Sequence, residues 1–373
     1  MSDSADVRHS PLDAEHRALG GRMVPFAGWD MPIRYGSVLD EHRACRTGAV
    51  VFDVSHMGSV WMRGPGAVAA LQGLLTNDLG RIGPGRAQYT HLLDDDASVV
   101  DDLIVWWVRP EELLVIPNAA NTAAVLPALL AAAAGAPGGA DVEPVTEQRA
   151  LLAVQGPEAR RRLADLAPEA AAVAHFGAVP TTLPGGVSGL VGGTGYTGED
   201  GVELFVPVEA AVDVWRALVA AGITPAGLGA RDTLRLEMGY PLHGHELGPG
   251  ITPLQAGLGW VVGWDKPAFA GRAALLAEKE RGPARRLAGI LLADRQVPRA
   301  ECPVLIDGAT AGEVTSGNVS PVLERGIALA FLPPGTKVGS AVEVDIRGRL
   351  APGEVVRPPF IKPGPSPPNP RRV

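Results

Sequence analysis

Short apolar runs alternate with helix-like segments along the first 146 residues, and those between about residues 55 and 145 predict one compact unit. Four segments predict strands: residues 50–52, 59–64, 86–108 (two strands around an acidic turn) and 113–121. Two segments are typical of helices, residues 65–75 and the alanine-rich residues 119–136. Strands and helices mixed in this order predict an α+β domain.

Residues 149–166 start the pattern again with a predicted strand, turn and helix. Two more strands are predicted around a glycine-rich turn, followed by an amphipathic helix over residues 209–222. Residues 224–239 predict another helix, with Thr224 at the N-cap and Pro225 in the first turn.

The C-terminal part changes character from about Leu287. Short strands between glycine and proline turns predict a small barrel or sandwich. After Phe360 the chain is mostly Pro, Gly and Ser, which predicts a mobile tail.

Length and charge narrow the class of protein. A chain of 373 residues exceeds one ordinary core and predicts two or three domains. The net charge of -8, without a basic run, argues against binding to nucleic acid. Cys45 and Cys302 form no Cys-x-x-Cys pair, so we expect two free thiols.

No segment predicts export or membrane insertion. The N-terminus is polar and mixed in charge, without the apolar stretch of a secretory signal, so a cytoplasmic protein is expected. Residues 119–136 are the most apolar run, but they are largely alanine and include Asn121 and Pro127. Alanine favours helix and gains little in lipid, so we predict a helix that does not span a membrane.

Three motifs that are often linked to cofactors or metals have simpler interpretations here. Residues 193–198 fit G-x-G-x-x-G, but a strand-like segment follows where a dinucleotide site needs a helix, so we predict a hairpin turn. His243 and His245 lack a third ligand at a standard spacing, because Glu246 points the other way. Asp94–Asp96 predict a solvated turn without a calcium pattern. No metal, nicotinamide or flavin site is expected.

Asp101 and Asp102 are adjacent on a predicted strand, so their side chains point to opposite faces. Asp102 shares its face with Ile104, and Asp101 shares the other with Leu103. Both faces are apolar, so either carboxylate can be a functional group, with a turn or capping role as the alternative. Arg231 can form an ordinary ion pair on its helix or can bind a carboxylate of a ligand.

Read together, the motifs resemble the T-protein family of the glycine cleavage system. Nine segments carry the resemblance in the family's order: residues 26–58, 64–79, 89–106, 116–121, 151–159, 192–204, 225–244, 252–262 and 312–321. They include the strings FAGWDMP, VVDDLIVW, GGTGYTGEDG and AGLGARDTLRLEMG. Any one could arise by chance, whereas nine in order cover almost the whole chain.

The resemblance implies a three-domain cloverleaf around a central folate channel. Residues 1–55 and 147–284 would form a discontinuous folate-binding domain, into which a ferredoxin-like α+β domain of residues 56–146 is inserted. Residues 285–373 would form a barrel or jelly-roll-like domain with the proline-rich tail.

The resemblance also implies an aminomethyltransferase of glycine catabolism and one-carbon metabolism. The one-carbon unit of an aminomethyl group on lipoylated H-protein would pass to tetrahydrofolate. The products would be methylene-tetrahydrofolate, ammonia and dihydrolipoyl H-protein. A monomer with a transient carrier partner, and with neither nucleic acid nor membrane as a partner, is expected.

Site residues follow from the resemblance position by position. Asp102 matches the catalytic aspartate of the family, and Glu203 matches the acidic residue that binds the pterin. The other expected folate-binding residues are Met57, Tyr89, Asn118, Tyr196, Arg231, Trp260 and Lys362. Some relatives carry Arg at the position of Lys362. Lysine keeps the positive charge but cannot make the bidentate hydrogen bonds of a guanidinium. His243 stands where relatives often carry Tyr.

Three other functions compete with the transferase. A folate-dependent demethylase of a small methylated amine or sulfonium compound would share the folate site and differ at the channel mouth. A folate-binding iron–sulfur assembly factor would carry a cysteine motif in the region of residues 263–275, where this chain has none. A protein that only binds folate would have no use for Asp102.

Overall fold

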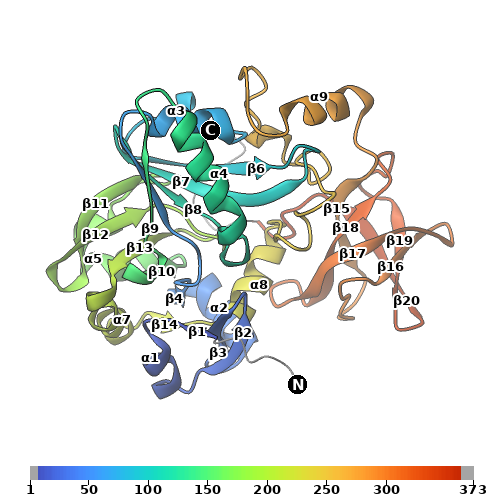
Figure 1. Cartoon of the computed structure of the whole chain (residues 1–373). Coiled ribbons are helices and arrows are strands. Elements are labelled where there is room, and N and C mark those ends of the chain that lie inside the picture. Colours follow the sequence, from blue (N-terminus) through green and yellow to red (C-terminus); the bar gives the residue numbers. More distant parts are fainter. Residues whose placement is uncertain (1–6, 363–373) are drawn as a thin grey trace, which may run out of the picture.

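The strands of residues 7–362, the part of the chain that the computed structural model describes, form four sheets. Three lobes surround a central helix (Figure 1). The lobe built on β10–β13 lies on the left, the lobe built on β6–β8 lies above it, and the barrel in orange and red lies on the right.

The first lobe is discontinuous in sequence. Its six-stranded sheet has the order β11-β12-β13-β10-β4-β14. The strands are β4 (Val50–Asp53), β10 (Arg149–Gln155), β11 (Ala178–Leu183), β12 (Val187–Gly192), β13 (Gly201–Pro207) and β14 (Thr224–Pro225). Because β4 and β10 pair antiparallel, the chain leaves this sheet after Asp53 and returns at Arg149.

Helices and a small sheet complete the first lobe. The helices are α1 (Asp13–Ala18), α2 (Val38–Thr47), α5 (Ala159–Ala164), α6 (Pro168–Ala171), α7 (Ala211–Ala220) and α8 (Leu228–Glu237). The small sheet holds β1 (Arg8–His9), β2 (Arg22–Phe26) and β3 (Trp29–Arg34). Short 3-10 helices lie along the chain at Leu79–Arg81, Ala119–Asn121, Thr146–Gln148, Pro184–Gly186, Val208–Ala210 and Gly259–Val261.

The inserted lobe has the ferredoxin-like arrangement that the resemblance implies. Its elements are β5 (Val60–Arg63), α3 (Ala67–Leu74), β6 (Arg86–Leu93), β7 (Val99–Arg109), β8 (Glu112–Ile116), α4 (Thr122–Gly135) and β9 (Asp141–Pro144). Counted from one edge, the sheet order is β9-β5-β8-β7-β6. The first four of these are the fourth, first, third and second strands of a split βαβ unit, and β6 is an added edge strand.

The third lobe is a closed barrel, which decides between the predicted barrel and sandwich. Helix α9 (Arg272–Arg281) precedes it. Its strands are β15 (Arg286–Leu292), β16 (Pro303–Ile306), β17 (Ala309–Ser320), β18 (Arg325–Leu332), β19 (Ala341–Ile346) and β20 (Arg349–Val356). Closure removes the free edges that an open sheet would expose.

Helix α8 joins the first lobe to the barrel. The guanidinium of Arg235 donates to the Ser316 hydroxyl over 2.8 Å, and the Ser320 hydroxyl donates to the carboxylate of Glu237. All four side chains are buried, so these bonds are made away from water. The helix thereby fixes where the two lobes meet.

The predicted start of this helix is wrong. Thr224 and Pro225 form β14 beside β4, and α8 begins at Leu228 after Gly227. The amide of Thr224 donates to the carbonyl of Ala49, just before β4, and the amide of Ala226 donates to the carbonyl of Val51 in β4, so long-range pairing overrides the local capping signal. A Cβ at Gly227 would lie 2.4 Å from the backbone of Ile33, which only glycine avoids.

The predictions for the domain boundaries and for the C-terminal tail stay open, and the helix lengths bear on the prediction about a membrane span. The domain boundaries at residues 55/56, 146/147 and 284/285 stay predictions. The predicted mobile tail begins at the edge of the described part, and residues 363–373 lie outside it. No helix within residues 7–362 is long and apolar enough to cross a bilayer.

Candidate active site

A cavity of about 880 Å³ lies where the three lobes meet. Its walls come from β7, the loop before β13, helix α8 and the barrel strands β17 and β18. Cavities of this size enclose ligands as large as a cofactor, and sites of this kind are common between domains.

Asp102 lies in the wall that β7 contributes. As the strand alternation predicts, Asp101 is buried behind the sheet and Asp102 lines the cavity. Oδ2 of Asp102 accepts a hydrogen bond from the Tyr89 hydroxyl at 2.9 Å, and Oδ1 accepts one from Nδ2 of Asn118 at 2.9 Å. The carboxylate is therefore held from both sides and faces open space.

Asp101 has a structural role next to it. Its carboxylate accepts the backbone N–H of Asn118 at 2.9 Å, the side-chain amide of Asn118 at 2.8 Å and that of Asn121 at 2.7 Å. Burial, followed by the charge of Asp102, raises the pKa of Asp101. Burial also raises the pKa of Asp102, and the Tyr89 hydroxyl opposes this rise. The side-chain amide of Asn118 thus donates to both carboxyl groups, but only that of Asp102 lines the cavity.

Two aromatic rings stack beside Asp102. The rings of Tyr89 and Trp260 lie 6.0 Å apart at 30°, although the residues are far apart in the sequence. Nε1 of Trp260 is buried and has no hydrogen-bond partner within residues 7–362. A flat apolar wall with an unused N–H donor suits a planar heteroaromatic ring.

Glu203 also lines the cavity, on β13. It is buried, and one of its oxygens accepts the hydroxyl of Thr194. Thr194 belongs to the glycine-rich loop that joins the antiparallel strands β12 and β13, so the predicted hairpin turn is confirmed. A Cβ at Gly195 would lie 2.0 Å from Gln155, which explains the glycine by packing.

Arg231 places a positive charge over the ring of Tyr196 in the cavity wall. The guanidinium carbon lies 5.0 Å from the centre of the Tyr196 ring, and the Tyr196 hydroxyl donates to the carbonyl of Pro241. Nη1 of Arg231 is buried and has no partner in the described part of the chain. Burial lowers the pKa of Arg231, and Glu203 opposes this. A buried donor of this kind is ready for an anionic or carbonyl acceptor of a ligand.

Met57 and His56 lie on the loop that follows β4. The guanidinium of Arg149 holds this loop by donating to the carbonyls of Ser55, at 2.9 Å, and Met57. Burial lowers the pKa of His56 to about 3, so its ring is neutral. Nδ1 of His56 is another buried polar atom of the cavity wall without a partner among the described residues.

The structure brings together eight of the nine predicted site residues. Asp102, Met57, Tyr89, Asn118, Tyr196, Glu203, Arg231 and Trp260 all line the cavity, as does His243. Lys362 is exposed and lies outside the lining, whereas Arg357 of the same segment belongs to it.

Sequence reasoning missed several polar groups of this region. Arg235 was not singled out, although it lines the cavity and is buried. Thr194 was treated only as part of a turn. His91 also passed unnoticed, and its Nε2 lies 3.3 Å from the Tyr89 hydroxyl. Its position two residues after Tyr89, on a strand paired with the Asp102 strand, was the available signal.

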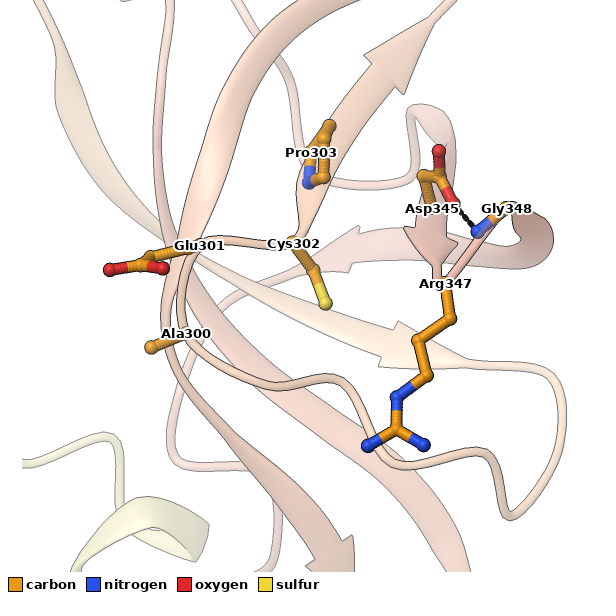
Figure 2. Close-up of a pocket in the computed structure, with 7 residues that line it drawn as sticks. All are labelled: Ala300, Glu301, Cys302, Pro303, Asp345, Arg347 and Gly348. Atoms are coloured by element: carbon orange, nitrogen blue, oxygen red, sulfur yellow. Dashed lines mark hydrogen bonds between the residues drawn. The ribbon is translucent and has the colours of Figure 1, made fainter.

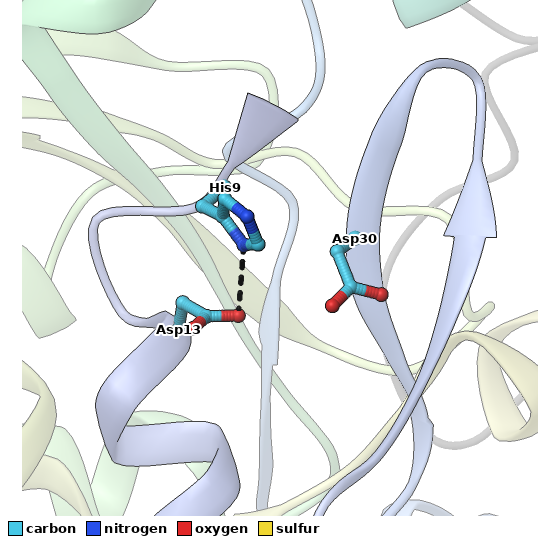
Figure 3. A group of neighbouring side chains, drawn as sticks. All are labelled: His9, Asp13 and Asp30. Atoms are coloured by element: carbon cyan, nitrogen blue, oxygen red, sulfur yellow. Dashed lines mark hydrogen bonds and ion pairs between the residues drawn. The ribbon is translucent and has the colours of Figure 1, made fainter. Parts of the chain in front are cut away.

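Two other places could suggest chemistry, and neither carries it. A hollow of about 280 Å³ on the barrel is lined by Cys302 and Arg347, and it is open to solvent (Figure 2). His9, Asp13 and Asp30 converge as metal ligands would (Figure 3). However, the guanidinium of Arg17 already bridges Asp13, at 2.9 Å, and Asp30, at 2.5 Å, so a cation is present there.

Comparisons with known proteins point to one family over most of the chain. Residues 12–266 match the family model described as the GCVT N-terminal domain, and residues 285–362 match the glycine cleavage T-protein C-terminal barrel domain. An aminomethyltransferase of Mycolicibacterium paratuberculosis is 50% identical, over 97% of this chain and 99% of that protein. One of Frankia alni is 49% identical, over 96% and 98% respectively.

A solved structure is similar in three dimensions as well. The crystal structure of glycine cleavage system aminomethyltransferase T from Bartonella henselae matches with a TM-score of 0.88 and 32% identity. The match covers 96% of this chain and 99% of that one.

Proposed function

The chain belongs to the glycine cleavage T-protein family and is an aminomethyltransferase, and from this premise we propose how its cavity works. The one-carbon unit of an aminomethyl group, carried on sulfur by the lipoyl arm of H-protein, passes to nitrogen 5 of tetrahydrofolate. Ammonia leaves, the thiol of the arm is freed, and the folate closes to the methylene form.

The observation that supports this most is the carboxylate of Asp102, fixed by Tyr89 and Asn118 at the wall of the cavity between the lobes. Transfer of an aminomethyl carbon from sulfur to nitrogen passes through a positively charged, iminium-like species. A preorganised negative charge in a water-poor site stabilises such a species strongly. Asp102 is therefore assigned as the catalytic residue.

The rest of the lining fits a reduced folate. The carboxylate of Glu203 offers two acceptors to the paired N–H edge of a pterin. The buried donors of Arg231 and Trp260, which have no partner among residues 7–362, suit the carbonyl and carboxylate oxygens of the same ligand. Met57, Tyr196 and the Tyr89–Trp260 stack supply apolar surface for its rings.

The partner and the setting follow from the same proposal. The aminomethyl group arrives on lipoylated H-protein, which docks transiently, and the enzyme works as a cytoplasmic monomer. The demethylase and iron–sulfur assembly alternatives are not favoured, because the relatives that match over nearly their full length are aminomethyltransferases.

One experiment tests the proposal directly. The protein is mixed with aminomethyl-loaded H-protein and tetrahydrofolate, and ammonia release and methylene-tetrahydrofolate formation are followed together. Both products should appear in equal amounts and should depend on both substrates. Formation of methyl-tetrahydrofolate from a free methylated amine or sulfonium compound, with no methylene-tetrahydrofolate from loaded H-protein, would instead identify a demethylase.

A further inference from the structure

His91 lies directly behind the group that holds the catalytic carboxylate. It is two residues from Tyr89 on β6, so both side chains point to the same face, and it is the ladder partner of Asp102 on β7. The imidazole is fully buried and is not part of the cavity wall. Its ring meets the Tyr89 ring edge-on, with 5.3 Å between the centres.

The hydrogen bonds around Tyr89 determine where the imidazole carries its hydrogen. A phenol has one hydrogen, and Tyr89 donates it to Oδ2 of Asp102 over 2.9 Å. The 3.3 Å contact between Nε2 of His91 and the Tyr89 oxygen therefore uses a lone pair of that oxygen, and Nε2 must be the donor. The order of donation is His91 to Tyr89 to Asp102.

The other ring nitrogen agrees with this assignment. Nδ1 of His91 is buried and has no hydrogen-bond partner within residues 7–362. A bare lone pair tolerates such a place better than an N–H group does. Burial lowers the pKa of His91 to about 3, so the ring is neutral near pH 7 and has only one hydrogen to place.

We propose that His91 is a positioning residue of the aminomethyl transfer: it fixes the Tyr89 hydroxyl so that this hydroxyl points at Asp102. Without the Nε2 donor, the phenol can rotate or donate elsewhere, and Asp102 loses one of its two fixed partners. The donor also polarises the phenol, which strengthens its bond to the carboxylate. As a statement about turnover, the inference rests on the proposed function.

A double-mutant cycle tests whether His91 acts through Tyr89. His91→Phe, which keeps an aromatic ring, should lower kcat about three- to tenfold, the size of one hydrogen bond, with the folate KM within about twofold. In a Tyr89→Phe background the same substitution should change kcat by less than about twofold, because no hydroxyl remains to be positioned. His91→Gln, whose amide can donate from the same region, should recover most of the loss.

Equal losses from His91→Phe in both backgrounds would show a merely structural role and overturn the proposal. If the native protein releases no ammonia from loaded H-protein, the proposed function fails instead. The hydrogen bonds from His91 to Tyr89 and from Tyr89 to Asp102 can then still be tested in the nitrogen-15 NMR spectrum of the native protein. The imidazole of His91 should carry its hydrogen on Nε2 throughout about pH 5 to 8. A hydrogen on Nδ1 would refute the inference without any activity measurement.

Discussion

The guanidinium of Arg231 stands over the Tyr196 ring, 5.0 Å from its centre, with a buried N–H that has no partner in the described chain. One turn further along α8, Arg235 is buried as well, but it is paired with Asp232 at 2.8 Å and Glu246 at 3.2 Å. The same helix therefore presents one arginine that awaits a ligand and one that holds the structure.

Arg231→Met should weaken folate binding about 10- to 100-fold, because charge-assisted hydrogen bonds contribute about 1.5–3 kcal/mol. The ligand-free protein should keep or gain stability, since the substitution removes a buried donor without a partner among the described residues. Binding can be measured by titration calorimetry and stability by thermal unfolding. Arg235→Met is the matched control and should lower the Tm of the ligand-free protein. Equal losses of Tm in both variants would contradict the assignment.

Asp102→Asn should lower kcat by about two to three orders of magnitude, the range seen when one preorganised electrostatic group is removed. The amide keeps the shape of the carboxylate, so folate affinity should change by less than about fivefold. Single-turnover ammonia release and equilibrium folate binding separate the two effects. Asp94→Asn, in the exposed turn before β7, should behave as the native enzyme. Normal turnover by Asp102→Asn would remove the catalytic assignment.

The central fold and most of the site were predictable from local pattern and resemblance. Strand alternation predicts that Asp101 and Asp102 face opposite ways, and the structure confirms it. Trp260 reaches Tyr89 across a gap of many residues, so only the resemblance pointed to it. Thr224 and Pro225 misled because pairing with β4 overrides their capping signal. Contacts between residues far apart in the sequence cannot be predicted from the neighbouring residues alone.

The C-terminal cation of the site stays a prediction, and two residues of the described chain are candidates for it. Arg357 lines the cavity and Lys362, five residues on, does not, although both are exposed. Arg357→Ala should raise the folate KM about three- to tenfold, as expected for a partly solvated contact to a carboxylate of the folate tail. Lys362→Ala should leave KM within about twofold. The opposite ranking in steady-state kinetics would restore Lys362 as the tail contact.

Glu237 should be essential to the joint between α8 and the barrel. It is buried and pairs with Arg46 at 2.8 Å while accepting the Ser320 hydroxyl. Glu237→Gln leaves the Arg46 charge with less compensation and should lower the free energy of unfolding by about 3–5 kcal/mol. Glu15→Gln, which breaks the more exposed pair with Arg216, should cost less than about 1 kcal/mol. Chemical unfolding measures both. Similar small losses would show that the buried contacts of Glu237 with Arg46 and Ser320 do not secure α8.

Stability should fall in mild acid because two buried histidines resist protonation. Burial lowers the pKa of His56 and of His91 to about 3, whereas an unfolded histidine titrates near pH 6.5. Their stabilising contribution is complete above about pH 6.5 and is lost as the pH falls toward 3, since only the unfolded chain takes up these protons in that window.

Each of these histidines should lower the free energy of unfolding by up to about 1.4 kcal/mol per pH unit below pH 6.5, or about 2 kcal/mol at pH 5. His91→Gln and His56→Gln should each flatten this dependence by about one proton, and the double variant by about two. Urea unfolding at several pH values between about 7 and 4.5 measures the slopes. Curves for the variants that run parallel to the native curve would mean that these rings are protonated in the folded protein. A neutral His91 as the fixed donor to Tyr89 would then be untenable as well.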